Sequence, residues 1–365
     1  MVSAANLSAA NLSATNVSVA SVAGIGLAQP PGIPQEELWD GFFSRYYAGT
    51  TKSLAQRIFA NSGIRTRQGA VNPLIEDVSE WPTERRMRRY LAEAMPLGKE
   101  AIGNALSAAG VAVGDIGMFV VCSCTGYVTP GLDILLARDL GMPPETQRLF
   151  VGHMGCYAAL PGLGAVGDYV AARGRPALLL CAELTSLHLQ PAKSRVDTQQ
   201  IVAHALFSDA AAAAVVVPGT GGYAVREVAA VTDTSTADHM TWDVTDLGFR
   251  MGLSPKVPQV LSQYVRPLVD DLLARHGRTR SDVDGWAVHP GGPRILTVVE
   301  KELGLTADQM AASRATLAEN GNCSSPTVLL IIDRLQRRPD PPERIVALAF
   351  GPGLTLYAAL LEHTG

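Results

Sequence analysis

The stretch LFVGHMGCYAALPGLGAVGDYVAA, residues 149–172, places Cys156 between a short apolar run and a long run of small side chains. Residues 149–151 predict a short strand, and the residues after Cys156 predict a helix that reaches about residue 172. The sulfur of Cys156 would then lie at a helix N-terminus, where free backbone N–H groups and the helix dipole favour the thiolate. We therefore interpret Cys156 as a candidate nucleophile; the alternative is a cysteine that packs as a small apolar side chain.

Strand-like and helical patterns alternate on both sides of this stretch. The run over residues 210–217 is strand-like, although its alanines leave a helix possible. Alternation of this kind predicts a layered α/β protein. The predicted strands are 116–122, 149–151, 177–181, 210–217, 285–288 and 345–349, and the predicted helices are 86–110, 132–140, 157–172, 257–276, 294–303 and 325–335.

The chain divides into an extension and two halves. The first residues read as a degenerate repeat (SAANL, SAANL, SATNV, SVASV), which is short, polar and uncharged. Such a segment is typical of a flexible extension, here predicted over residues 1–16. The glycine-rich sequence PGTGGY is the predicted seam between a first half over 17–221 and a second half over 222–365.

Composition excludes several classes of protein. With 365 residues, 47% hydrophobic and 18% charged, the chain can bury a large core and is not disordered. Its 30 Lys and Arg against 34 Asp and Glu give a net charge of -4, which predicts neither a nucleic-acid nor a polybasic membrane surface. No apolar run reaches the roughly 18 residues of a membrane span. Because the first basic residue is Arg45, no signal peptide is indicated and a cytosolic location is expected.

The five cysteines do not predict a disulfide framework or a metal site. Their odd number and apolar surroundings favour reduced, buried thiols. Cys122 and Cys124 are separated by one residue, which is not the spacing of a zinc or redox motif. We expect neither a metal nor a redox cofactor.

Two further segments carry candidate catalytic residues. In WAVHPGGP, His289 ends an apolar strand and enters a rigid turn, so its imidazole is a candidate base or hydrogen-bond donor. In ENGNCSS, Asn322 is a candidate donor to an oxyanion. The alternatives are a core histidine and a residue that caps the next helix. Condensing enzymes need such a set, because a thiolate accepts an acyl group and two neutral donors stabilise an enolate.

Six segments resemble the signatures of type III polyketide synthases, the chalcone synthase-like enzymes, in the form found in bacteria. They run in the right order from about residue 17 to the C-terminus. The resemblance implies a thiolase fold, in which two related halves form a five-layer α-β-α-β-α sandwich. It also implies a homodimer with CoA thioesters as substrates and no cofactor. The segments are CTGYVTPG, AELTS, ALFSDAAAA, HPGGPRIL, ENGNCSSPTVLL and AFGPGLT.

The resemblance assigns roles to individual residues. Cys156 matches the nucleophile, His289 the base and donor, and Asn322 the second oxyanion donor. Phe207 matches the aromatic gatekeeper that orients malonyl-CoA and helps exclude water, and Phe249 matches a second gatekeeper. Core packing is the alternative for either phenylalanine.

The match is weaker where the carrier phosphates should bind. Arg57 matches one CoA-phosphate contact, but two lysines of the plant pattern are Leu54 and Asn61 here. The resemblance therefore implies that Arg57 acts with Lys52 or Arg65.

Further positions match residues that line the reaction pocket. Thr129 matches a residue that reaches into the partner subunit's cavity. His188 stands where a small residue is more typical, so it is expected to narrow the cavity or to assist cyclisation. The pocket-lining positions are Cys124, Thr125, Thr185, His188 and Ser324.

The implied reaction is an iterative decarboxylative condensation. Malonyl-CoA or methylmalonyl-CoA extends an acyl-CoA starter bound to Cys156, and the chain closes to an alkylpyrone or alkylresorcinol. An all-malonyl product such as tetrahydroxynaphthalene is the alternative. Two rival functions are a ketoacyl synthase III-type enzyme, whose His segment normally carries an Asn soon after the His, and a catalytically silent scaffold.

Overall fold

The computed structural model describes residues 19–190 and 197–365, so the predicted extension over residues 1–16 lies outside the described residues. Nine strands form one hydrogen-bonded series in the order β11-β12-β13-β8-β1-β7-β6-β4-β5. Their bounds are β1 Ala20–Ala28, β4 Met118–Cys122, β5 Gln147–Val151, β6 Ala177–Glu183, β7 Ala210–Pro218, β8 Gly222–Thr232, β11 Gly285–Val288, β12 Arg344–Gly351 and β13 Thr355–Thr364.

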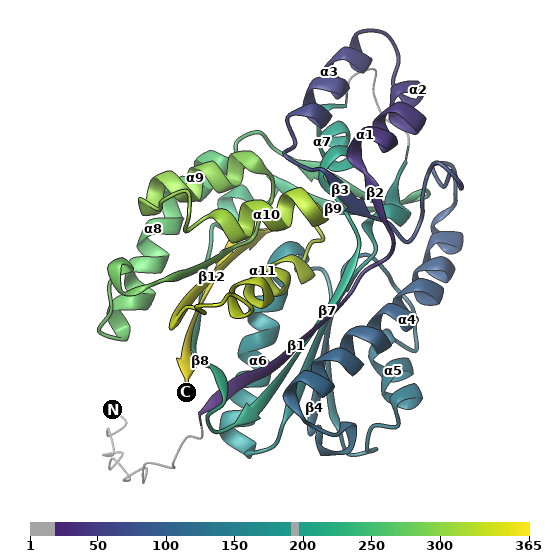
Figure 1. Ribbon diagram of the computed structural model, residues 1–365. Coiled ribbons are helices and arrows are strands. Elements are labelled where there is room, and N and C mark those ends of the chain that lie inside the picture. The colour runs from purple at the N-terminus through teal and green to yellow at the C-terminus, as the bar shows by residue number, and fades with distance from the viewer. Residues whose placement is uncertain (1–18, 191–196) are drawn as a thin grey trace, which may run out of the picture.

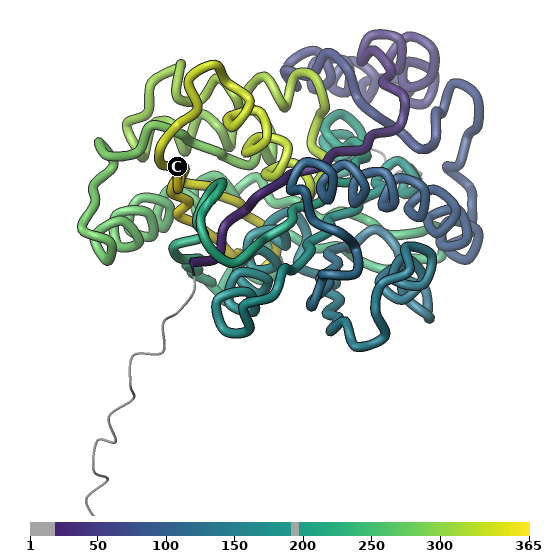
Figure 2. The backbone as a smooth tube through the Cα atoms, turned by 60° about the horizontal axis from the view of Figure 1, so that its bottom comes forward, coloured from purple at the N-terminus to yellow at the C-terminus, as the bar shows by residue number. Residues whose placement is uncertain are grey.

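The strand series consists of two sheets that meet at one point. In the first, β5, β4 and β6 are parallel, and β7 and β1 continue the sheet antiparallel. In the second, β11 and β12 are parallel, and β13 and β8 follow antiparallel. The sheets are joined where Ser21 and Val22 of β1 pair with Ala224 and Tyr223 of β8. Figure 2 shows β1, in purple, running between the two halves of the chain.

Helices complete five layers. Two helices lie between the sheets, α4 and α5 cover the outer side of the first sheet, and α8 and α9 cover the outer side of the second (Figure 1). The predicted α-β-α-β-α arrangement is therefore confirmed. The bounds are α4 Thr83–Ala109, α5 Leu132–Leu140, α6 Ala159–Arg173, α8 Val257–Arg275, α9 Pro293–Leu303, α10 Ala311–Asn320 and α11 Pro326–Gln336, with α6 and α11 in the middle layer.

The middle layer explains the small residues that follow Cys156. α6 packs against both sheets, so its backbone must approach their strands closely. A Cβ atom on Gly162 would lie 2.8 Å from Leu179 Cδ1 and 2.9 Å from Cys122 Sγ. Since larger side chains would push the layers apart, small residues are required on this helix. The alanine-rich run of β7 forms a strand, and β7 lies between α4 and α11. Close packing against both helices again requires small side chains.

A smaller group of elements covers one end of the sandwich. Among them, α3 packs against α7, and β9 pairs with β10 as a hairpin (Figure 1, top). The sequence pattern predicted none of these elements, nor β8, β13 and α10. No helix in the described parts of the chain is both long and apolar enough to cross a bilayer. The bounds of this group are β2 Gly32–Pro34, α1 Gln35–Leu38, α2 Ser44–Tyr46, α3 Gly49–Ala60, β3 Thr66–Gln68, α7 Thr198–Leu206, β9 Met240–Thr245 and β10 Gly248–Leu253.

Candidate active site

Three elements bring Cys156, His289 and Asn322 to one cavity. Cys156 lies in the turn Gly155–Tyr157 that leads into α6, His289 directly follows β11, and Asn322 lies between α10 and α11. All three residues line a cavity of about 820 Å³. The fold thus places the starts of both middle-layer helices, one from each half of the chain, at the same site.

Burial dominates the electrostatics of Cys156. Burial raises the pKa of its thiol to about 11, Glu183 acts in the same direction, and contacts with Ser324 and Asn322 lower the pKa. A backbone hydrogen bond at Cys156 also lowers the pKa, in the direction predicted for the helix N-terminus, but burial has the larger effect. Ionisation of Cys156 needs a base that takes the proton as the charge forms.

His289 lies on the same cavity wall as Cys156. Its residue is 1% exposed, and neither ring nitrogen has a hydrogen-bond partner among the described residues. The backbone N–H donates to Leu348 O at 2.8 Å, which ties the residue to β12. Burial lowers the pKa of the imidazole to about 3. The ring is therefore neutral near pH 7 and offers one N–H donor and one acceptor nitrogen to a molecule in the cavity.

Asn322 is oriented by its own turn. Its Oδ1 accepts a hydrogen bond from the Ser324 N–H at 2.9 Å, which leaves the amide NH2 group as a donor. Ser324 adopts a φ of 58°, a left-handed conformation that turns the chain into α11. The Asn322 amide contributes to lowering the pKa of the Cys156 thiol. It can therefore stabilise negative charge next to the sulfur.

Phe207 is held beside Asn322 by the backbone. The Ser208 N–H donates to Asn322 O at 2.9 Å, and the Asn322 N–H donates to Leu206 O at 2.8 Å, which forms a parallel bridge. Arg67 Nη1 donates to Phe207 O at 3.0 Å. Because the backbone on both sides of Phe207 is fixed, its ring has a defined place on the cavity wall.

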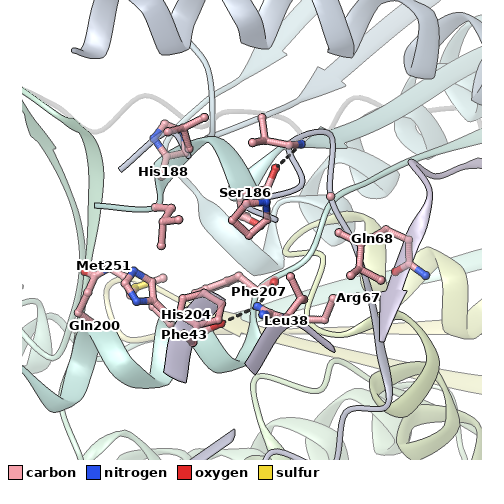
Figure 3. Close-up of a pocket in the computed structure, with 18 of the residues that line it drawn as sticks. Leu38, Phe43, Arg67, Gln68, Ser186, His188, Gln200, His204, Phe207 and Met251 are labelled. Carbon is pink, nitrogen blue, oxygen red and sulfur yellow. Dashed lines mark hydrogen bonds between the residues drawn. The ribbon is translucent and has the colours of Figure 1, made fainter. Parts of the chain in front are cut away.

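A second cavity of about 80 Å³, here called the inner chamber, also has Phe207 in its wall (Figure 3). Thr185 and His188, both predicted to line the pocket, are on its wall, and so is Phe249, which was predicted as a second gatekeeper at the tunnel mouth. A third space of about 20 Å³ contains both Cys156 and Thr185 in its lining. Phe207 stands at the meeting point, since it lines all three spaces. Apolar residues of the inner chamber include Ile33, Leu38, Phe43, Val71, Val78 and Leu189.

His188 is a fixed part of this wall. Its Nδ1 accepts from the Phe249 N–H at 2.9 Å, so Nε2 carries the proton and donates to Thr125 O at 2.7 Å. The ring is stacked on Phe249 at 4.7 Å and meets Trp242 edge-on at 5.4 Å. Burial lowers the pKa of His188 to about 3. Both nitrogens are engaged and the ring is neutral, so the geometry supports narrowing of the cavity rather than proton transfer in cyclisation.

The β9–β10 hairpin supplies residues that the sequence reasoning missed. Trp242 and Met251 line both the 20 Å³ space and the inner chamber. The indole Nε1 donates to Cys124 O at 2.8 Å, which fixes the hairpin to the loop after β4. An aromatic in an alternating pattern seven residues before Phe249 was the available signal for Trp242.

Glu183 joins the remaining predicted pocket residues. Its carboxylate accepts from the backbone N–H groups of Cys124 and Thr125, from Thr125 Oγ1 at 2.8 Å and from Ser325 Oγ at 2.9 Å. Burial raises its pKa to about 7, although these hydrogen bonds oppose the shift. The sequence reasoning missed Glu183, and its signal is one acid at the end of a fully apolar strand. Cys124, Thr125 and Ser324 line the 20 Å³ space together with Cys156.

Two predicted site residues lie elsewhere. Arg57 on α3 is exposed and is not among the residues that line the large cavity, whereas Ile58 and Asn61 are. Thr129 is exposed in the loop between β4 and α5. Neither residue is brought to the reaction centre of this subunit.

Known proteins share both the sequence and the fold. The family models of the N-terminal and C-terminal domains of chalcone and stilbene synthases match residues 7–220 and 225–364. The alpha-pyrone synthesis polyketide synthase-like Pks18 of Mycobacterium tuberculosis is 32% identical, over 84% of this chain and 81% of that protein. The 1,3,6,8-tetrahydroxynaphthalene synthase of Streptomyces peucetius is 34% identical, over 86% and 85%.

A solved structure gives the same result. The crystal structure of PKS-I from the brown alga Ectocarpus siliculosus superposes with a TM-score of 0.86 at 30% identity, and the match covers 95% of this chain and 99% of that one. The predicted thiolase fold is therefore confirmed.

Proposed function

Because the chain belongs to the chalcone and stilbene synthase family, the type III polyketide synthases, we propose that it extends an acyl-CoA starter with malonyl-CoA or methylmalonyl-CoA at Cys156. The observation that carries this proposal is the single 820 Å³ cavity that Cys156, His289 and Asn322 share. A rival ketoacyl synthase III-type function has no comparable support, because the matched relatives are polyketide synthases.

The first step is acyl transfer to the thiol. His289 takes the proton from Cys156 as the sulfur attacks the starter thioester, and CoA leaves as its thiol after receiving that proton. Formed together, the thiolate and imidazolium stabilise each other in a site that disfavours either charge alone. The Asn322 amide supports the sulfur.

The second step is decarboxylation and condensation. The bond between the malonyl carboxylate and its α-carbon breaks, CO2 leaves, and the electron pair moves to the thioester oxygen as an enolate. The His289 N–H and the Asn322 NH2 group hold this oxyanion. The enolate carbon attacks the acyl carbonyl, and the Cys156 thiolate is the leaving group. The oxyanion is held by neutral hydrogen-bond donors, and the condensation as a whole is redox-neutral. We therefore propose that neither a metal nor a redox cofactor takes part.

Further rounds return the extended chain to Cys156 until it cyclises. We propose an alkylpyrone or alkylresorcinol as the product, in line with the alpha-pyrone synthesis of one relative. The second candidate is an all-malonyl product, and it is supported by the tetrahydroxynaphthalene synthases at similar identity and by Cys124 in the 20 Å³ space beside Cys156.

We also propose a cytosolic homodimer. β5 is the outermost strand of the first sheet and is exposed along most of its length. Leu149 and Phe150 on this strand are each 40% exposed. Ile134 on α5, which packs against β5, is 41% exposed, and Tyr127 in the loop after β4 is 68% exposed. An open apolar strand edge of this kind is completed by a second copy of itself. Thr129, in the same loop as Tyr127, would then lie against the partner.

Mass spectrometry of products tests the function. Purified enzyme is supplied with malonyl-CoA and a panel of acyl-CoA starters, beside Cys156→Ala and Asn322→Ala. We expect products from the wild type, none from Cys156→Ala, and about a hundredfold to a thousandfold slower decarboxylation in Asn322→Ala, which still accepts an acyl group. Full decarboxylation by Asn322→Ala would remove Asn322 from the mechanism, and products from Cys156→Ala would refute the proposal.

A further inference from the structure

The wall of the large cavity is almost without charge. Among the described residues that line it, Arg294 is the one side chain with a formal charge, since His289 is neutral. Arg294 is exposed and makes no hydrogen bond or ion pair with a described residue. An anionic group of a ligand in this cavity would bind most favourably beside the Arg294 guanidinium, because no other described side chain on the wall carries a charge.

The backbone around Arg294 favours the same kind of ligand. Arg294 is the second residue of the eleven-residue helix α9, and Gly292, Pro293 and Ile295 line the cavity beside it. No side chain caps this helix. Pro293 has no N–H, and the Ile295 and Leu296 N–H groups donate to Gly292 O at 3.1 and 3.3 Å, so the Arg294 N–H is the first-turn donor without a partner among the described residues. This N–H and the positive end of the helix dipole both attract phosphate.

The chain itself connects this point to the reaction centre. Arg294, which is exposed, is five positions after His289, which is 1% exposed, and both line the same cavity. The unpartnered ring of His289 marks the buried part of the wall, and Arg294 is one of its exposed residues, together with Asn61, Thr198, Gln199 and Pro255. Of these exposed residues, Arg294 is the one with a charge that can pair with a carrier phosphate.

The basic residues on and near α3 are less well placed. Arg57 is absent from the cavity wall, and Arg65 pairs with Glu319 at 3.3 Å. The part of α3 and the turn after it that do face the cavity are uncharged, since they carry Ile58, Asn61 and Ser62.

We propose that Arg294 and the first turn of α9 bind the phosphate groups of the thioester carrier, in place of Arg57. This proposal rests on the proposed function and names how the substrate carrier is recognised. The ligand is a phosphate ester on a pantetheine arm, which is present both in CoA and in a phosphopantetheinylated acyl carrier protein.

Steady-state kinetics of the full-length enzyme test the proposal. Arg294→Ala, Arg294→Lys, Arg57→Ala and the control Lys301→Ala, an exposed residue in the last turn of α9, are compared with the wild type. Each is assayed with malonyl-CoA, with malonyl-acyl carrier protein and with malonyl-N-acetylcysteamine, which has no phosphate. The wild-type KM values for malonyl-CoA and malonyl-acyl carrier protein are compared, and the substrate with the lower KM identifies the natural carrier.

For Arg294→Ala we expect KM for malonyl-CoA to rise about tenfold with kcat unchanged, as for loss of a charged hydrogen bond. KM for malonyl-N-acetylcysteamine should not change, Arg294→Lys should recover part of the loss, and Lys301→Ala should behave as wild type. A rise with Arg57→Ala but not Arg294→Ala would overturn the proposal. An equal rise in KM for malonyl-CoA and for malonyl-N-acetylcysteamine in Arg294→Ala would also overturn it, because that result indicates lost packing. Absence of any product from the wild type would instead refute the proposed function.

Discussion

At the scale of single residues, buried polar side chains shape the reaction pocket. Both ring nitrogens of His188 are hydrogen-bonded, one to the Phe249 N–H and one to the Thr125 carbonyl, and the ring stacks on Phe249. The Glu183 carboxylate accepts hydrogen bonds from the loop that carries Cys124 and Thr125 and from Ser325 at the start of α11. Buried polar groups of this kind are costly unless fully paired, and once paired they hold a single arrangement. Pocket shape therefore depends on residues that do not react.

Removal of the His188 ring should lengthen the products. In His188→Ala the inner chamber, whose wall includes the His188 ring, becomes larger, so we expect products with at least one more extension unit and acceptance of bulkier starters. In His188→Phe the volume stays filled, so product length should stay as in the wild type. Both variants should lose about 2 kcal/mol of unfolding free energy with the two hydrogen bonds. Product mass spectra and urea denaturation measure the two effects, and unchanged product length in His188→Ala would contradict the role of His188 in narrowing the pocket.

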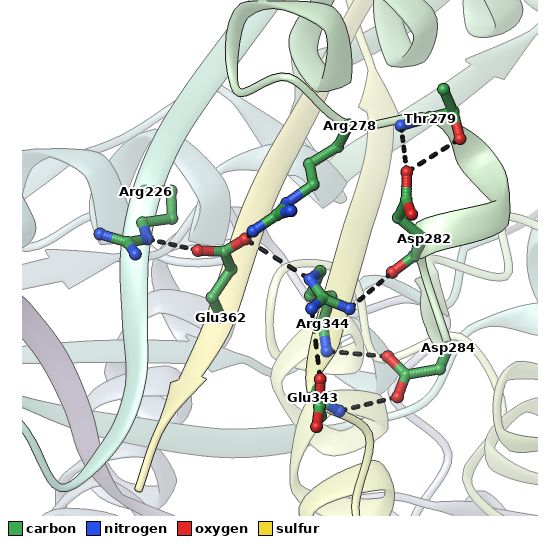
Figure 4. A network of polar contacts seen from close by, with 8 residues as sticks. All are labelled: Arg226, Arg278, Thr279, Asp282, Asp284, Glu343, Arg344 and Glu362. Atoms are coloured by element: carbon green, nitrogen blue, oxygen red, sulfur yellow. Dashed lines mark hydrogen bonds and ion pairs between the residues drawn. The ribbon is translucent and has the colours of Figure 1, made fainter.

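At the scale of elements, charged side chains tie the second sheet together at one end (Figure 4). The Glu362 carboxylate on β13 forms ion pairs with Arg226 from β8 at 2.7 Å and with Arg278 from the turn after α8 at 3.4 Å. Arg344, its neighbour on β12, lies at 3.7 Å. One carboxylate thus links three strands and a turn. Such a network is worth more than an isolated surface pair because its geometry is shared.

Glu362 should make stability depend on pH. Burial alone would raise the pKa of its carboxyl, but Arg226 and Arg278 outweigh burial and lower it. A lowered pKa in the folded state means that the stabilisation is present above the unfolded value of about 4.3 and is lost as pH falls through the folded value. We expect Glu362→Gln to unfold about 1 kcal/mol more easily at pH 7, with the difference shrinking below pH 4.5.

Urea denaturation at pH 7, 5 and 4 measures this difference. Glu100→Gln serves as the control, because Glu100 is an exposed acid on α4 outside the ion-pair network. A deficit in Glu362→Gln that stays constant from pH 7 to pH 4 would show that the carboxylate charge is not its cause.

At the scale of the whole molecule, the first sheet ends in an open edge. β5 pairs with β4 on one side and presents its other side, with exposed Leu149 and Phe150, to solvent in the single chain. Pairing of this edge with a second copy would extend the sheet through two subunits and bury the apolar side chains. The proposed homodimer therefore completes a surface that one chain leaves unfinished.

Phe150→Asp should break that assembly. A carboxylate at the strand edge disfavours burial against an identical copy, so we expect sedimentation equilibrium to change from about twice 38.5 kDa to 38.5 kDa. Val244→Asp introduces the same charge at a residue that is 72% exposed on the β9–β10 hairpin and should remain dimeric. A monomeric wild type, or dissociation of both variants alike, would count against β5 as the interface.

The long periodic elements and the three catalytic candidates were predictable from the sequence. Helices such as α4 and α8 and strands such as β4 and β6 carry their signal locally, in the spacing of apolar residues. β8 was missed because only Tyr223 and Ala224 on it are buried and the rest of the strand is half-buried or exposed. β13 was missed although most of it is buried. The hairpin β9–β10 was missed because its pattern is short and mixed.

The sequence by itself determined the layered fold, the family and the Cys156, His289 and Asn322 set, because each is expressed in local motifs and periodicity. Only the tertiary structure decided the electrostatics and the walls of the site. Desolvation, which no local pattern expresses, raises the pKa of Cys156 against the pull of the helix N-terminus. Side-chain direction and packing likewise leave Arg57 off the cavity wall and place Arg294 on it, because they depend on how distant elements meet.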